Sequence, residues 1–278
     1  MTSGIGGAAL SGHSLLNGGV ALVALGGFGP PLLVAAARAT SGEGAPRMPS
    51  DRHGAAFDAV YAPTRIKHPM VRRAYLEQGA GAERGSRGKG DFVRVSWERA
   101  LDLVAAELRR VAGVHGSAAV FSGADGGESR GQLHGRPRLL RRLMSLTGVA
   151  VAACDAPRAA PWDAAEAGEI KLAYWLGGLL PVAGADRNRL LRLWRSLETC
   201  IVQDSHWTPA ARRADIVLPT TTSWERDDIE CVDDEAGRSL RPIKRLIAPL
   251  FESRSDHAIF AALAERLGKG QAFTESRS

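Results

Sequence analysis

Short apolar runs alternate with amphipathic segments through the last third of the chain, and this pattern limits the possible folds. "LAYWL" at 172–176, "CIV" at 200–202 and "IVLP" at 216–219 are each short enough to be one buried strand. Segments with helical periodicity separate or follow them, and the last of these runs from 255 to 268. Strands that alternate with helices predict an α/β fold with a doubly wound, mainly parallel sheet.

Three details extend this prediction. "RSLRPIKRLI" at 238–247 is a candidate for a fourth strand. Asp256 stands where the N-cap of the last helix is expected, and Gly268 stands where that helix should stop. Asp204 follows a predicted strand directly and could cap a helix after it.

The rest of the chain divides by composition. Residues 1–45 contain no Lys, Arg, Asp or Glu before Arg38, which favours a degenerate export signal or a disordered segment over a membrane span. Residues 46–151 predict a smaller α/β segment, with a helix that starts after Ser96 and ends at Gly113. Residues 152–169, rich in Ala, Pro and Asp, are the expected linker to a nucleotide-binding segment at 170–278.

Charge and cysteine content exclude some functions. The net charge of +6 favours an anionic partner only weakly, because the basic residues are scattered. The arginines between 136 and 142 are typical of a solvent-exposed helix face, so no nucleic-acid partner is expected. Three distant cysteines have no spacing typical of a zinc site, an iron–sulfur site or a disulfide framework.

Polar residues and glycines stand where the three predicted strands end, and parallel sheets bind ligands at that edge. Gly177 and Gly178 end the first strand and would let backbone amides approach an anion, although such a pair often makes only a turn. Gln203 and Asp204 end the second and could accept hydrogen bonds from a sugar or a guanine edge. Three threonines and Arg226 follow the third, and the alternative for Arg226 is a surface pair with Glu225 or Asp228.

These strand ends lie within long stretches that resemble one family, the dimethyl sulfoxide and trimethylamine N-oxide reductases among the molybdopterin oxidoreductases. The similar stretches are "VYAPTRIKHPMVRRAYLEQG", "RGKGDFVRVSWERALDLVAAELRRV", "IKLAYWLGG", "DRNRLLRLWRSLETCIVQDSHWTPAARRADIVLPTTTSWERDDIE" and "ESRSDHAIFAALAERLGKGQAFTE". Together they cover most of residues 58–150 and 170–276.

The resemblance implies a periplasmic oxidoreductase that reduces S-oxides or N-oxides with a molybdenum bis(molybdopterin guanine dinucleotide) cofactor. It also implies that the first region is the remains of a twin-arginine export signal. Six residues match positions that contact the guanine dinucleotide in the family, namely Gly177, Gly178, Gln203, Asp204, Arg226 and Asp256.

The chain also departs from the family pattern. Leu179 and Leu180 replace an asparagine-proline pair after the glycines, and Ala183 stands in place of a histidine. Asp125 and Gly127 stand where the family has a tyrosine and a tryptophan near the metal.

The family's molybdenum-binding serine is missing from "CDAPR" at 154–158, where Cys154 and Asp155 are the candidate ligands and an inert cysteine is the alternative. A long central segment and a C-terminal domain are also expected to be absent. The alternative function is therefore a catalytically dead, truncated remnant that keeps a nucleotide-binding α/β module. A partner subunit is left open.

Overall fold

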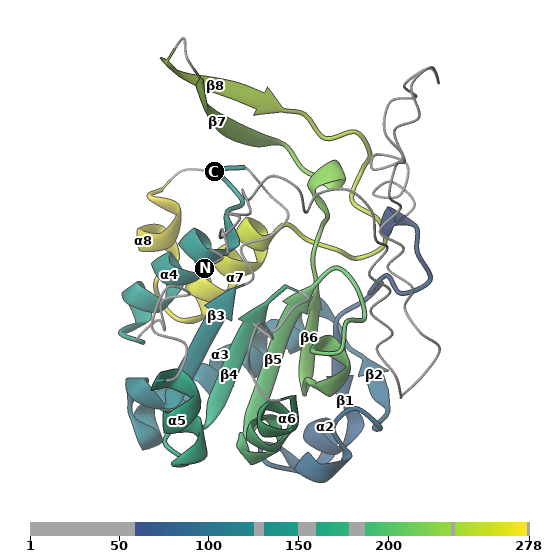
Figure 1. Cartoon of the computed structure of the whole chain (residues 1–278), viewed down its shortest axis with the longest axis vertical. Helices are drawn as coiled ribbons and strands as arrows, with labels where there is room; N and C mark the ends of the chain where they lie inside the picture. Colours follow the sequence, from purple (N-terminus) through teal and green to yellow (C-terminus); the bar gives the residue numbers. More distant parts are fainter. Residues whose placement is uncertain (1–58, 125–130, 150–159, 178–186, 235–236, 277–278) are drawn as a thin grey trace, which may run out of the picture. The chain divides into compact units, whose positions relative to one another are not determined.

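Six strands form one sheet in the order β2-β1-β6-β5-β4-β3 (Figure 1). The computed structural model describes residues 59–124, 131–149, 160–177, 187–234 and 237–276. The strands of this sheet are β1 (Met70–Arg72), β2 (Phe92–Arg94), β3 (Val120–Ala124), β4 (Leu172–Leu176), β5 (Thr199–Asp204) and β6 (Ile216–Pro219). The last four pair in parallel, whereas β1 pairs antiparallel with both β2 and β6.

The predicted α/β class with a mainly parallel sheet is confirmed, and so are the three strands predicted from apolar runs. All residues of β4, β5 and β6 are buried, as expected for strands covered on both faces. The parallel strands β3 to β6 lie in the same order as in the sequence. The doubly wound detail stays a prediction.

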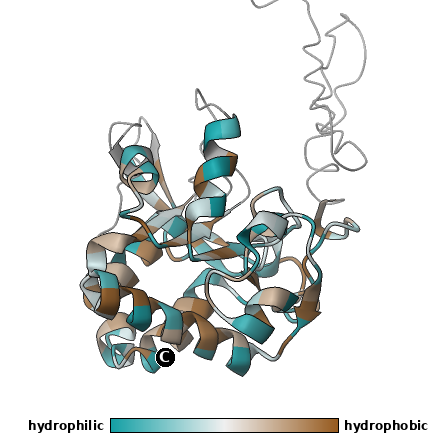
Figure 2. Cartoon of the chain, turned by 90° about the horizontal axis from the view of Figure 1, so that it is seen from below, coloured by the Kyte–Doolittle hydropathy of each residue, from teal (hydrophilic) through white to brown (hydrophobic). Residues whose placement is uncertain are grey.

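Helices cover both faces of the sheet and enclose a separate apolar core on each. The helices are α2 (Arg73–Gln78), α3 (Trp97–His115), α4 (Arg136–Thr147), α5 (Ala160–Glu166), α6 (Arg187–Ser196), α7 (Asp256–Arg266) and α8 (Gly270–Thr274), with short 3₁₀ turns η1 (Arg84–Ser86), η2 (Ser117–Ala119), η3 (Ala211–Arg213) and η4 (Ser223–Glu225). On β4, Leu172, Tyr174 and Leu176 pack with α3, α4 and α7, whereas Ala173 and Trp175 pack with α5 and α6. This alternation follows from the two-residue period of a strand. In Figure 2 the helices carry hydrophobic and hydrophilic colours on different sides.

Helix α3 begins as the sequence predicts and continues further. The Ser96 hydroxyl accepts a hydrogen bond from the Arg99 N–H at 3.1 Å, which confirms the N-cap. The helix passes through Gly113, where its end was predicted, and ends at His115. Gly116 follows with φ of 85°, a conformation that residues with a Cβ rarely adopt.

A fourth strand forms in the region where it was expected, but it does not join the six-stranded sheet. Residues 237–243 form β8 (Gly237–Ile243), which pairs antiparallel with β7 (Asp228–Asp234) in a two-stranded sheet of its own. Figure 1 shows this hairpin projecting beyond the carboxyl ends of the parallel strands. A hairpin strand needs no crossover helix, and "DDIECVDD" is too polar to indicate a buried strand.

The sequence segments on either side of 152–169 share one sheet and one compact unit, which covers residues 59–278. The expected linker therefore does not separate two folding units among the described residues, and its residues 160–166 form α5. Residues 1–45 and 152–159 lie outside the described residues. No helix in the described part of the chain is long and apolar enough to span a membrane.

A buried charge cluster joins elements at the amino ends of the parallel strands. Asp215, fully buried before β6, accepts hydrogen bonds from Arg72 Nε at 2.9 Å and from Arg87 Nη2 at 2.6 Å. Its Oδ2 also accepts the Cys200 N–H at 2.8 Å. Arg87 Nη1 donates to the Leu197 carbonyl at 3.0 Å, after the end of α6. One carboxylate thus connects β1, the loop after η1, β5 and β6.

We expect Asp215→Asn to lower the free energy of unfolding by about 3–5 kcal/mol, because it leaves two buried guanidinium groups without their counter-charge. Urea denaturation followed by circular dichroism measures this change. Asp102→Asn is the matched control, since Asp102 forms an exposed pair with Arg266 and should cost about 0–1 kcal/mol. Equal losses in the two variants would contradict the structural role of Asp215.

Candidate functional site at the carboxyl ends of the strands

Gln203, Arg226 and Asp256 come from three separate elements and meet at the carboxyl ends of the parallel strands. Gln203 Nε2 donates to Asp256 Oδ1 at 2.7 Å, and Arg226 Nη1 lies 3.4 Å from Asp256 Oδ2. Gln203 and Asp256 have no exposed surface, and Arg226 is 6% exposed. Three of the residues expected at the site therefore form one buried hydrogen-bonded network.

The positions of these residues follow from the elements that hold them. Gln203 is near the end of β5, opposite Leu176 of β4 and Leu218 of β6. Arg226 follows η4, and its Nη1 also donates to the Thr221 carbonyl at 3.1 Å. Asp256 is the first residue of α7.

The predicted N-cap at Asp256 is wrong by one position. The Ser255 hydroxyl caps α7 by accepting the Ala258 N–H at 3.2 Å. The Asp256 carboxylate is therefore directed to Gln203 and Arg226 instead. An anionic group in the first turn of a helix is still favoured by the helix dipole.

Tyr174 belongs to the same network, although its sequence context predicts only a buried strand. Its hydroxyl donates to Gln203 Oε1 at 2.8 Å from the centre of β4. Burial raises the pKa of Tyr174 well above its ordinary value, and the Asp256 carboxylate adds to this. The phenol is therefore a permanent donor, and the Gln203 amide nitrogen points to Asp256.

Arg136 is a further member that the sequence analysis placed on a solvated helix face. It is the first residue of α4, its side chain is 11% exposed, and its Nε lies 3.5 Å from Asp256 Oδ2. Gly135 at the N-cap and the absence of an acidic residue in the first turn were the only sequence signals of a positive helix end.

His134 lies beside this cluster. Burial lowers its pKa, the nearby Arg226 lowers it further, and Asp228 and Asp256 oppose this effect. Asp228 fixes the segment before α4, because its Oδ1 accepts the Leu133 N–H at 2.9 Å. A Cβ at Gly131 would lie 1.7 Å from Asp228 Oδ2, so this close approach requires glycine.

Asp204 is held within a local turn, and the helix-cap alternative is wrong because Ala210 stands at the N-cap of the next helical turn, η3. Its Oδ1 accepts the Ser205 N–H at 2.7 Å, and its Oδ2 accepts the Thr208 hydroxyl at 2.9 Å. Burial raises the pKa of Asp204, and Arg136 opposes this increase. The Asp204 carboxylate therefore serves the local turn, and Arg136 acts on it only through its charge.

The pairs suggested for Arg226 would not lie on the surface, because Arg226, Glu225 and Asp228 are all at most 6% exposed. Glu225 is buried and pairs with Arg65, with Arg65 Nη2 2.6 Å from Glu225 Oε2. Glu225 also completes a capping box with Thr222 at the start of η4. Glu225 therefore fixes the backbone that follows β6. Arg226 is directed to Asp256 instead of to Glu225.

Two hydroxyl groups that directly follow β6 are buried without a hydrogen-bond partner among the described residues. They belong to Thr220 and Thr221, both at most 1% exposed. A buried hydroxyl without a partner is unfavourable, so these two groups are available as donors to a ligand that reaches them.

The remaining expected site residues are only partly described. Gly177 has φ of 95° and donates its N–H to the Gln203 carbonyl at 3.0 Å, so this amide is already used within the sheet. Gly178, Cys154 and Asp155 lie outside the described residues. In the described ranges, no three His, Cys, Asp or Glu side chains gather in a group that could hold a metal.

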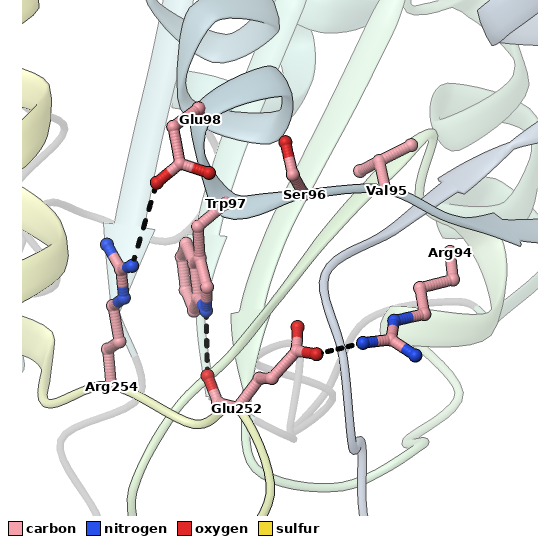
Figure 3. A pocket seen from close by; sticks show the side chains of 7 residues that line it. All are labelled: Arg94, Val95, Ser96, Trp97, Glu98, Glu252 and Arg254. Carbon is pink, nitrogen blue, oxygen red and sulfur yellow. Dashed lines mark hydrogen bonds and ion pairs between the residues drawn. The ribbon is translucent and has the colours of Figure 1, made fainter.

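An open, polar hollow of about 390 Å³ lies at the N-terminus of α3 (Figure 3). Its charged groups pair with each other, Arg94 with Glu252 and Arg254 with Glu98, and Arg254 stacks on Trp97 at 4.6 Å. None of the site residues predicted from the sequence lines it.

We expect the free energy of unfolding to fall as the pH is lowered below about 6.5, the ordinary pKa of histidine. The folded chain holds His134 at a lower pKa, so the unfolded chain binds more protons in this range. Urea denaturation between pH 7.5 and 5 should show a smaller loss for His134→Gln than for the wild type. Identical pH dependence in both proteins would contradict a buried, uncharged His134.

Comparison with known proteins places this geometry in a family. A family model described as "Molybdopterin oxidoreductase" matches residues 65–160 and 155–266. These two matches include every strand of the six-stranded sheet and all of α7.

Curated relatives match a shorter part of the chain. The dimethyl sulfoxide/trimethylamine N-oxide reductases of Cereibacter sphaeroides and Rhodobacter capsulatus are 59% and 54% identical over 109 residues, which is 39% of this chain and 13% of each relative. The trimethylamine-N-oxide reductase of Haemophilus influenzae is 41% identical over 110 residues, 40% of this chain and 13% of that protein. The alignments with these relatives thus span about 13% of their length.

One solved structure, acetylene hydratase from Pelobacter acetylenicus, matches with a TM-score of 0.39 and 19% identity. The match covers 50% of this chain and 20% of that protein.

Proposed function

The chain belongs to the molybdopterin oxidoreductase family, and on this basis we propose that the cluster around Asp256 binds the guanine dinucleotide end of a molybdopterin cofactor. The observation that carries the proposal is the convergence of Gln203, Arg226 and Asp256 at one edge of the sheet. Parallel sheets bind nucleotides beyond the carboxyl ends of their strands, and this cluster lies there.

The groups present fit a nucleotide. Arg226 and Arg136 carry guanidinium groups that suit phosphate oxygens. Asp256 supplies carboxylate oxygens that can accept hydrogen bonds from a guanine or a sugar. Thr221, whose carbonyl holds Arg226, has a buried hydroxyl with no hydrogen-bond partner among the described residues.

We further propose that the activity is the reduction of S-oxides or N-oxides, as in the named relatives. The molybdenum cofactor, when bound, supplies the redox chemistry that removes the substrate oxygen. The chain's own described residues would bind and orient the nucleotide end through Arg226, Asp256 and Gln203. Cys154 and Asp155 remain proposed metal ligands, and a periplasmic location remains part of this proposal.

A second candidate function is nucleotide binding without turnover. It is favoured by the sequence near the expected metal position, because Asp125 and Gly127 stand where the family has a tyrosine and a tryptophan. Every contact of the Asp256 network described above nevertheless lies within residues of this chain. The network could therefore bind a nucleotide even where no oxide is reduced.

Metal and pterin content separates the two candidates. If the chain is a reductase, the purified protein should contain about one molybdenum and two pterins per chain by elemental analysis and by fluorescence of the oxidised pterin. Reduction of dimethyl sulfoxide or trimethylamine N-oxide should then occur with a reduced dye as electron donor. If the purified protein contains no molybdenum and no pterin and reduces neither substrate, the proposed reductase activity is overturned. Nucleotide binding without turnover is then the remaining candidate function.

Nucleotide binding is tested by calorimetry with GDP on the full chain. We expect Arg226→Ala to weaken GDP binding by about 10-fold or more, because one charge-assisted hydrogen bond to a phosphate is lost. Arg73→Ala is the control, since Arg73 is exposed on α2. Equal affinities of the wild type and Arg226→Ala would remove the proposed site.

A further inference from the structure

Two arginines share the Asp256 carboxylate, and they are the parts of the cluster that reach the surface. Arg136 Nε and Arg226 Nη1 lie 3.5 Å and 3.4 Å from the same oxygen, Oδ2. The side chain of Arg136 is 11% exposed and that of Arg226 is 6% exposed, whereas that of Asp256 is fully buried. Of these three charged side chains, the two arginines are therefore more accessible to a ligand than the carboxylate is.

A buried chain of hydrogen bonds fixes the orientation of this carboxylate from behind. Tyr174 donates to Gln203 Oε1 at 2.8 Å, and Gln203 Nε2 donates to Asp256 Oδ1 at 2.7 Å. A phenol can donate only one hydrogen bond, so it sets which end of the Gln203 amide faces Asp256. With Oδ1 held in this way, Oδ2 is directed to the two arginines.

The charges at this point favour an anion. Two guanidinium groups meet one carboxylate oxygen, and the N-terminus of the twelve-residue helix α4 adds a partial positive charge. Asp204 and Asp228 add negative charge nearby, but Asp204 already accepts hydrogen bonds from Ser205 and Thr208, and Asp228 already accepts the Leu133 and Ile229 N–H groups. The buried hydroxyl of Thr221, beside Arg226, is a further donor for an oxyanion.

We propose that Arg136 contacts the phosphate groups of the bound nucleotide together with Arg226, and that Tyr174, Gln203 and Asp256 are positioning residues that hold the two arginines. This inference rests on the proposed function and changes one part of it. Gln203 and Asp256, expected from the sequence to contact the ligand, act through the arginines instead. The ligand group recognised here is a nucleoside diphosphate, identified by its phosphate oxygens.

The first experiment compares GDP with guanosine, which lacks the phosphates, by calorimetry on the full chain. Arg136→Gln should weaken GDP binding by about 10-fold and leave guanosine binding within about 2-fold. Arg141→Gln, an exposed arginine of the same helix, should change neither affinity. If Arg136→Gln binds GDP as tightly as the wild type does, the role of Arg136 is overturned.

The second experiment tests the positioning residues with a double-mutant cycle. In the wild-type background, Tyr174→Phe should weaken GDP binding by about 3- to 10-fold. In the Arg136→Gln background, the same substitution should weaken GDP binding much less, because both changes act on the same phosphate contact. Additive effects, or an equal loss of guanosine binding, would overturn the positioning role and indicate a general structural effect. Thermal unfolding of each variant checks that it folds.

The outcomes separate this inference from the proposed function. If the wild type binds GDP and Arg226→Ala weakens it while Arg136→Gln does not, the proposed site stands and the inference fails. If the wild type binds neither GDP nor inorganic pyrophosphate, both fail. Arg136→Lys gives a second variant at this position, and partial recovery of GDP binding relative to Arg136→Gln would support a charge contact.

Discussion

The parallel register of β4, β5 and β6 determines where the polar groups of the candidate site can lie. Gln203 is opposite Leu176 on one side and Leu218 on the other, so the polar residues that follow these strands appear at one edge of the sheet. Both faces of the strands are buried by helices, and a polar side chain on them must therefore find a partner within the protein. Tyr174 and Gln203 meet this requirement by bonding to each other and to Asp256.

Two buried carboxylates perform related tasks at opposite ends of the sheet. At the amino ends, Asp215 accepts hydrogen bonds from two arginines and one backbone amide. Its charge thereby balances the two guanidinium groups that are buried there. At the carboxyl ends, Asp256 faces two arginines at longer distances, and these arginines retain some exposed surface. The first arrangement suits a structural role. The second leaves the guanidinium groups able to turn to an anionic ligand.

The sequence predicted the strands of the sheet well and their connections less well. Strands β4, β5 and β6 were identified from apolar runs, because a strand buried on both faces needs such a run. The β7–β8 hairpin was not identified, because its strands are polar and pair only with each other. The start of α3 followed from Ser96, whereas its end depended on the left-handed conformation at Gly116 and not on Gly113.

The sequence by itself determined the α/β class, the family resemblance, and the residues that follow each strand. It could do so because strand periodicity and the exits of parallel strands are local properties of the chain. Only the tertiary structure decided that Arg226 pairs with Asp256 and Glu225 with Arg65, and that Arg136 and Tyr174 belong to the same cluster. These pairings join residues 29 to 160 positions apart. Which charges meet across such separations depends on how the helices pack on the sheet, and local sequence does not record this.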